Sequence, residues 1–109
     1  MDGLNNYIYE VQRGTKPMAL VTLVESKLET AIKKIEKSGL SYAVQELEGK
    51  VNIFFGHSPC VETVRGFLHK KLHELSAEED FILGTMLGYC RIAQCERYLG
   101  RTKPIKKLA

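Results

Sequence analysis

Apolar positions along the chain repeat with the period of a helix in some stretches and that of a strand in others. Residues 4–13 carry apolar side chains every three to four positions up to Gly14, which predicts a helix and its end. Residues 18–24 form a short apolar run rich in β-forming side chains, which predicts a mostly buried strand. Two more strands are predicted at 41–47 and 51–55, joined by a glycine-containing turn of the hairpin type.

Helix-start signals predict two helices between these strands and the C-terminal third of the chain. Ser26 and Glu29 have the spacing of a capping box, and the helix behind them should end at Gly39. Ser58, followed by proline, predicts the cap of a second helix. Its apolar stripe continues to Leu75, so we expect one helix over this whole stretch.

The last predicted helix is the most unusual element. A second capping box, Ser76 with Glu79, starts it, and it should run to about Leu99. Residues 81–93 are apolar around nearly the whole circumference, which is typical of a helix buried on all sides. A small domain cannot easily surround such a helix, so we expect it to pack partly on its own sheet and partly on a second subunit. The alternative is that it fills a monomeric core.

The predicted elements follow the order α-β-α-β-β-α-α, which indicates the α+β class. A strand, a crossover helix and a hairpin most simply give a three-stranded, mainly antiparallel sheet in the order 1-3-2. This is a truncated ferredoxin-like arrangement, with the helices expected on one face. We predict a single domain over residues 1–100, followed by a basic tail at 101–109.

The sheet order leaves the strand at 18–24 at an open edge, and an apolar edge strand favours pairing with another chain. Gly84 and Gly88 are four residues apart, so on a continuous helix they would share a face that allows close approach of another backbone. We therefore expect a homodimer. The candidate interface residues are Met18, Leu20, Thr22, Gly84, Leu87, Gly88, Arg91 and Cys95.

The composition indicates the class of protein and its cellular compartment. The 109 residues are 44% hydrophobic and 27% charged, which is typical of an ordinary folded domain. Three cysteines without a Cys-x-x-Cys pair favour a reducing compartment over a disulfide-bonded secreted domain. The N-terminus lacks signal-peptide character, and the longest dense apolar stretch is about ten residues, too short to cross a bilayer. We expect a cytoplasmic protein that does not enter the membrane.

Cys60 and His57 form the first candidate for chemistry. They stand where a strand ends and a helix begins, and a helix N-terminus favours the thiolate form of a cysteine. The functional hypothesis is a reactive or redox-sensing thiol, with His57 as its base or ion partner. The competing interpretation, a small buried cysteine in a well-capped turn, is the one we favour.

His69 and His73 form the second candidate. Two histidines four apart on a helix can chelate a metal ion. Glu62 lies too far along the same face to complete the site, and the neighbouring lysines oppose a cation. We therefore expect an ordinary solvated helix face, with no metal and no cofactor.

Lysines gather in three places: Lys33, Lys34 and Lys37; Lys70 and Lys71; and the C-terminal tail. Such patches can contact nucleic-acid phosphates or an acidic protein, and lysine is also the usual residue for solubility. The net charge is only +3, and no aromatic side chains interleave with the lysines as stacking platforms. An acidic protein partner is thus the stronger of the two binding hypotheses.

Several segments together resemble a small bacterial family of domains of unknown function, of about this length. They are Tyr9-Glu10 before Gly14, Val51 to Gly56, Glu78 to Gly84, Leu87-Gly88-Tyr89 and Gln94 to Leu99. The resemblance implies three strands, about five helices and a homodimer. It implies no activity and hence no catalytic residues. The family pattern has aspartate at the position of Cys90.

The sequence thus predicts a non-catalytic, dimeric interaction or accessory protein. The first alternative is a thiol-based redox or regulatory protein that uses Cys60 with His57. The second is weak binding of nucleic acid or an acidic protein through the lysine-rich faces.

Overall fold

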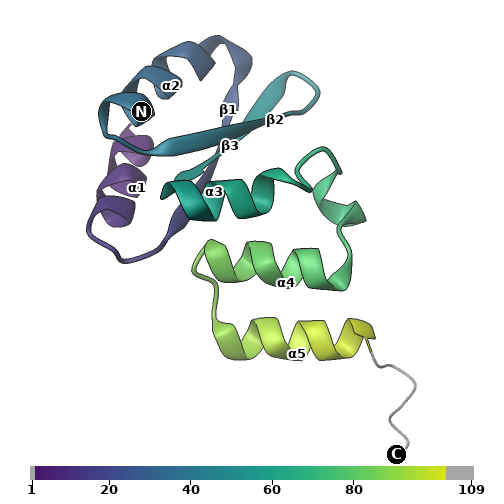
Figure 1. The fold of residues 1–109 in the computed structure, drawn as a ribbon. Coiled ribbons are helices and arrows are strands. Elements are labelled where there is room, and N and C mark those ends of the chain that lie inside the picture. Colours follow the sequence, from purple (N-terminus) through teal and green to yellow (C-terminus); the bar gives the residue numbers. More distant parts are fainter. Residues whose placement is uncertain (1, 103–109) are drawn as a thin grey trace, which may run out of the picture.

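The computed structural model describes residues 2–102 of the chain, and its central feature is a three-stranded antiparallel sheet (Figure 1). The strands are β1 (Met18–Val24), β2 (Ser41–Glu46) and β3 (Lys50–Gly56), in the order β1-β3-β2. This confirms the predicted fold class, strand positions and sheet order. Met18 pairs with Gly56 at one end of the β1–β3 ladder, and Val24 pairs with Lys50 at the other.

Between residues 2 and 102, five α-helices accompany the sheet, one more than the apolar pattern predicts. They are α1 (Asp2–Gln12), α2 (Leu28–Lys37), α3 (Ser58–Arg65), α4 (Ala77–Met86) and α5 (Arg91–Thr102). Two single turns of 3₁₀ helix, Glu25–Lys27 and Leu72–Glu74, precede α2 and α4. Gly14 and Gly39 follow α1 and α2 with positive φ angles, as their predicted role as helix stops requires.

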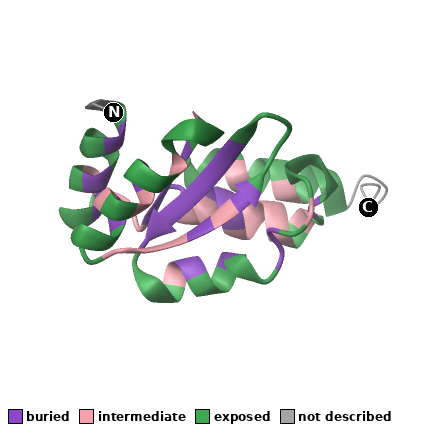
Figure 2. Cartoon of the chain, turned by 90° about the horizontal axis from the view of Figure 1, so that it is seen from above, coloured by how far each residue is buried: buried purple, intermediate pink, exposed green. Residues whose placement is uncertain are grey.

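The helices cover both faces of the sheet, whereas one covered face was expected. Ala19, Val21 and Phe55 belong to a core cluster with α1 and α2. Phe54 and Met18 belong to a second cluster with α3, α4 and the segment between them. The central strand explains the difference, because every residue of β3 after Lys50 is buried (Figure 2). A strand that is apolar on both sides requires cover on both sides.

The predicted continuous helix from Ser58 to Leu75 is wrong beyond Arg65. The chain turns at residues 66–70, and a row of polar side chains across the sheet holds this turn. Thr22, Asn52 and Gln45 stand directly opposite one another on the three strands. Thr22 Oγ1 donates to Asn52 Oδ1 at 2.6 Å, and Asn52 Nδ2 donates to Gln45 Oε1 at 2.8 Å. Gln45 Nε2 then donates to the carbonyl oxygens of Leu68 and Lys70. These bonds satisfy carbonyls that an α-helix would have paired internally.

The long C-terminal helix was also predicted wrongly, because it is broken. Gly88 has φ +80°, a left-handed conformation that ends α4, and α5 folds back beside it as a helical hairpin. α5 continues to Thr102, so the predicted domain end at residue 100 falls inside this helix. The remainder of the predicted basic tail, 103–109, lies outside the described residues.

Two of the predicted caps differ from those observed. The Ser76–Glu79 capping box is formed, with Ser76 Oγ accepting from Glu79 N at 3.1 Å. The box predicted for Ser26 and Glu29 is not formed, because a 3₁₀ turn occupies that position and Lys27 is the N-cap. His57, not Ser58, is the N-cap of α3, and it makes no side-chain capping bond.

Between residues 2 and 102, no helix has the length and apolar character that crossing a membrane requires.

Candidate interaction surface

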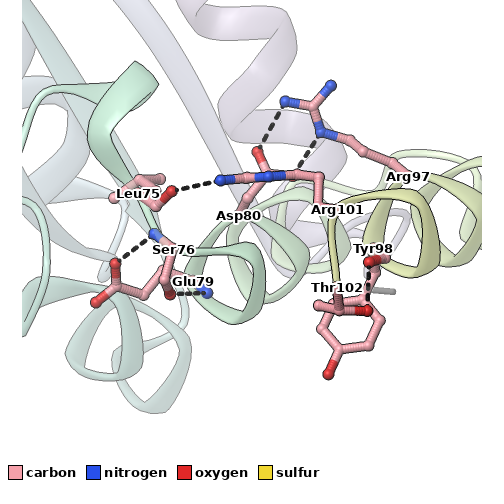
Figure 3. A network of polar contacts seen from close by, with 8 residues as sticks. All are labelled: Leu75, Ser76, Glu79, Asp80, Arg97, Tyr98, Arg101 and Thr102. Atoms are coloured by element: carbon pink, nitrogen blue, oxygen red, sulfur yellow. Dashed lines mark hydrogen bonds and ion pairs between the residues drawn. The ribbon is translucent and has the colours of Figure 1, made fainter. Parts of the chain in front are cut away.

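The α4–α5 hairpin is joined by a polar seam. Asp80 on α4 accepts a hydrogen bond from Arg97 Nε of α5 at 2.6 Å, and Arg101 Nη1 lies 3.8 Å from the same carboxylate (Figure 3). Arg101 also donates to the carbonyl oxygen of Leu75 at 2.9 Å. The hydrogen bond and charge of Asp80 raise the pKa of Arg97 above its ordinary value. Part of the side of α5 that faces α4 is therefore polar.

The opposite side of α5 is apolar and faces outward. Ile92, Cys95 and Leu99 recur at the i, i+3, i+7 spacing of a single helix face. The exposed fractions of Ile92 and Leu99 are 72% and 48%, and Cys95 is also exposed. None of the residues of α5 is buried. This distribution is the reverse of that of a surface helix in a lone subunit, which buries its apolar stripe.

A groove of about 480 Å³ continues this apolar surface between the two helices. Its lining is mostly apolar and consists of Glu78, Phe81, Ile82, Cys95, Tyr98 and Leu99. Within this lining the rings of Phe81 and Tyr98, one from each helix, pack in a tilted arrangement with centroids 5.4 Å apart. We call the groove together with Ile92 the hairpin face. Contiguous exposed apolar surface of this kind is typical of a protein–protein contact.

The predicted dimer-interface residues divide into two groups in the structure. Met18, Leu87 and Gly84 are buried within the chain itself, so they present no surface to a partner. Gly84 allows close approach as expected, but the approaching group is the Gln94 side chain of α5. Thr22, Gly88, Arg91 and Cys95 are exposed, and Leu20 is half-buried beside a hollow.

Cys60 and His57 lie where the sequence places them, at the junction of β3 and α3. The Cys60 backbone N–H donates to the His57 carbonyl oxygen at 3.0 Å, as in an ordinary first helical turn. The Cys60 side chain is half-buried against the second core cluster, while His57 is exposed. No hydrogen bond joins the imidazole and the thiol in the described chain.

His69 and His73 do not share a helix face, because α3 ends before them. His69 lies in the turn after α3 and His73 in the 3₁₀ turn before α4, and both are exposed. The i, i+4 geometry on which the metal hypothesis depended is thus not formed. Within residues 2–102, no cluster of three or more His, Cys, Asp or Glu side chains has the arrangement of a metal site.

The lysine patches do not converge. Lys33, Lys34 and Lys37 are on α2, which covers one face of the sheet, whereas Lys70 and Lys71 follow α3 on the other. Lys70 is also engaged, because its Nζ lies 2.8 Å from Glu79 Oε1. The tail lysines lie outside the described residues. No continuous basic face is thus formed by the two described patches.

Apart from Cys95, the residues of the hairpin face were not among the predicted interface residues, and the Asp80–arginine seam was not predicted. An available signal was Gly88 beside Tyr89 within an otherwise helical pattern, since a glycine there can end a helix. Once the chain is divided at Gly88, the second half has a narrow apolar stripe of its own. When residues 81–93 are read as one continuous helix, this stripe and the apolar residues of α4 together cover the whole circumference. Such a pattern indicates a helix that is buried on all sides.

Comparison with known proteins supports the family resemblance. No curated protein matches the chain. A family model described as "Protein of unknown function (DUF2023)" matches residues 3–101, which include all three strands and all five helices except their extreme ends. The chain therefore belongs to the DUF2023 family, a family of proteins of unknown function.

Proposed function

We propose that this protein is a non-catalytic, homodimeric interaction protein of the cytoplasm, whose two copies join through the hairpin face. The observation that carries the proposal is the outward apolar stripe of α5, Ile92, Cys95 and Leu99. A helix that contacts its own subunit through arginines and exposes its apolar side gains stability when a partner covers that side.

A second copy suits this face because the face is complementary to itself. The Asp80–Arg97 and Gly84–Gln94 contacts set Ile82 and Cys95 at about the same level in the groove. Glu78 and Arg91 then lie at opposite ends of the hairpin. A two-fold axis that reverses the helix direction brings the Glu78 end of one copy to the Arg91 end of the other. The result is an antiparallel four-helix bundle with opposite charges at each end.

The cytoplasmic location rests on the cysteines. Cys60, Cys90 and Cys95 are all free thiols, and two of them are exposed. Exposed free thiols are typical of proteins in a reducing compartment.

Sedimentation of the full chain tests the dimer. We expect a particle of twice the chain mass at micromolar concentration. Leu99→Glu places a charge in the apolar face and should raise the dimer Kd by roughly 100-fold, which corresponds to about 2.7 kcal/mol. Leu47→Glu is the matched control, since Leu47 is an equally exposed leucine in the β2–β3 turn, far from the hairpin face in the fold.

Two results would contradict the proposal: a wild-type chain that sediments as a monomer, or a dimer that both substitutions weaken equally. In the first case the hairpin face belongs to a different partner. In the second, the interface lies elsewhere.

A further inference from the structure

The outer edge of β1 has unpaired backbone groups. The His57 backbone N–H donates to the Pro17 carbonyl oxygen at 3.2 Å, which fixes the hydrogen-bonding phase of the β1–β3 ladder. In this phase the N–H and C=O groups of Leu20, Thr22 and Val24 point away from β3. The N–H and C=O groups of Leu20 and Thr22 and the N–H of Val24 have no backbone partner within residues 2–102, whereas the Val24 carbonyl oxygen, at the N-cap, is the first acceptor of the 3₁₀ turn Glu25–Lys27.

This edge also lacks the usual protection against another strand. Natural edge strands are commonly blocked by a lysine, an internal proline or a bulge. The seven residues of β1 contain none of these and pair in regular register from Met18 to Val24. The edge therefore retains the geometry needed to accept a further strand.

A hollow lies on each side of the edge. One, of about 350 Å³, is formed with α1 and includes Leu4, Tyr7 and Leu23 in its lining. The other, of about 290 Å³, is formed with the α4–α5 hairpin on the opposite face, and Leu20 and Arg97 both line it. The side chains of an added strand alternate between the two faces of a sheet, so they would enter the two hollows in turn.

The charge beside the second hollow indicates what such a strand should carry. Asp80 is paired with two arginines, Arg97 and Arg101, so this cluster has a net charge of +1. The Arg97 side chain is 57% exposed, and its Nη1 has no hydrogen-bond partner in the described part of the chain. A carboxylate entering this hollow would form a charge-assisted hydrogen bond with it.

We propose that the β1 edge binds an extended segment of a protein partner by strand addition, with apolar side chains at alternate positions and an acidic residue facing Arg97. Backbone hydrogen bonds supply the affinity in this mode of recognition, and the alternate side-chain hollows supply the selectivity. β1 of a second copy fits less well, because its seven residues carry no charge. This proposal uses a different surface from the hairpin face and does not depend on the dimer.

The test uses peptides selected on the full chain. Random twelve-residue peptides displayed on phage are selected on the immobilised protein, and the enriched peptide is synthesised with a fluorescent label as the probe. We expect enriched sequences with alternating apolar residues and at least one Asp or Glu. Conversion of that acidic residue to its amide should weaken binding roughly 5- to 10-fold, as for a charge-assisted hydrogen bond.

Backbone methylation of the probe then distinguishes strand addition from other binding. Two versions are made, each N-methylated at every second residue. An added strand uses only alternate N–H groups toward β1, so one version should lose at least about tenfold in affinity and the other should bind nearly as before. These tests change only the peptide probe, so their results do not depend on whether a protein variant folds.

A protein variant locates the site. Val24 has φ −70°, an angle that proline adopts, so Val24→Pro removes an outward N–H without backbone strain. It should weaken the probe severalfold, whereas Glu48→Pro, at the second position of the β2–β3 turn that Gly49 completes with φ +74°, is expected to leave the affinity unchanged. Binding of the probe is also measured with the Leu99→Glu chain, and we expect it to persist there. This measurement separates a failure of the dimer proposal from a failure of the edge-site proposal.

Three outcomes would overturn the proposal: no enriched peptide, equal binding of the two methylated probes, or an affinity unaffected by Val24→Pro. A fourth would assign the edge to a second copy instead. In that case the Leu99→Glu chain stays dimeric, and the Leu20, Thr22 and Val24 amides resist hydrogen exchange without any peptide.

Discussion

At the scale of single residues, Gly56 shows how closely the sheet is packed. It is the last residue of β3 and stands opposite Met18. A Cβ atom at this position would overlap the Pro17 carbonyl oxygen and lie 2.8 Å from Met18 Cα. Both are backbone atoms, which cannot rotate aside as the end of a side chain can. Glycine at position 56 therefore allows the backbone of Pro17 and Met18, at the start of β1, to pass this close to the end of β3.

Gly56→Ala should destabilise the fold by about 2 kcal/mol, as overpacking of a rigid site does. Gly66→Ala is the matched control, because Gly66 has φ −64° and ψ −20° with open space around it. That change should be neutral or stabilising by up to about 1 kcal/mol, since alanine restricts the unfolded chain. Urea unfolding followed by circular dichroism, at one protein concentration, compares the three chains. Equal midpoints for the two variants would contradict the close approach at Gly56.

At the scale of elements, the start of α4 depends on Glu79. Its Oε1 accepts from the Ser76 backbone N–H at 2.9 Å and lies 2.8 Å from Lys70 Nζ. The hydrogen bond from Lys70 and then that from the Ser76 backbone lower the pKa of Glu79 below its ordinary value of 4.5. One carboxylate thus caps α4 and also connects it to the turn that follows α3.

The lowered pKa of Glu79 gives a pH dependence of known sign. A depressed folded-state pKa means that the unfolded chain binds the proton more readily, so the contribution to stability is present above pH 4.5 and is lost as the pH falls through the folded-state pKa. Stability should therefore fall less steeply below pH 4.5 in Glu79→Gln than in the wild type. Glu29→Gln is the control, because Glu29 is an exposed carboxylate in the first turn of α2 that makes no side-chain hydrogen bond or ion pair within residues 2–102. Urea midpoints measured from pH 3 to pH 7 make the comparison. If Glu79→Gln follows the wild-type curve, the carboxylate does not act as described.

At the scale of the whole molecule, α5 is the outermost layer of an elongated body measuring 53 × 32 × 22 Å. It packs on α4, which in turn lies beneath α3 and the sheet (Figure 1). A layer with no buried residue gains little from its own subunit beyond the arginine seam, the Phe81–Tyr98 ring pair and the Gln94 contact at Gly84. Exposed ion pairs of this kind contribute little stability on their own. The stability of α5 should therefore depend on whether another molecule covers its apolar side.

If a second copy provides that cover, the thermal midpoint should rise with protein concentration. A tenfold increase in concentration favours a dimer by about 1.4 kcal/mol, which for two chains of this size corresponds to roughly 3 °C. Leu99→Glu should abolish the dependence, and α5 amides should then exchange faster than those of β3. Calorimetry at several concentrations and hydrogen exchange measure the two effects. A midpoint independent of concentration in the wild type would count against the dimer.

The sequence by itself determined the local elements and the order of the sheet. Alternation and apolar runs depend only on neighbouring residues, so β1, β2 and β3 were predicted nearly to their ends. Gly14, Gly39 and the Ser76–Glu79 box were likewise predicted, because a positive φ angle and a cap are local requirements. The candidate thiol at Cys60 was placed correctly at the start of a helix for the same reason.

Only the tertiary structure decided where helices end and which surface stays open. The turn after Arg65 exists because Gln45, on a strand twenty residues earlier, bonds the carbonyls of Leu68 and Lys70. The apolar run of 81–93 looks like one buried helix until the chain folds back after Gly88 and α4 meets α5. Arg97 and Arg101 of α5 then contact Asp80, and the apolar stripe stays outside. Periodicity gives the faces of a helix, but contacts between residues far apart in sequence determine which face is covered.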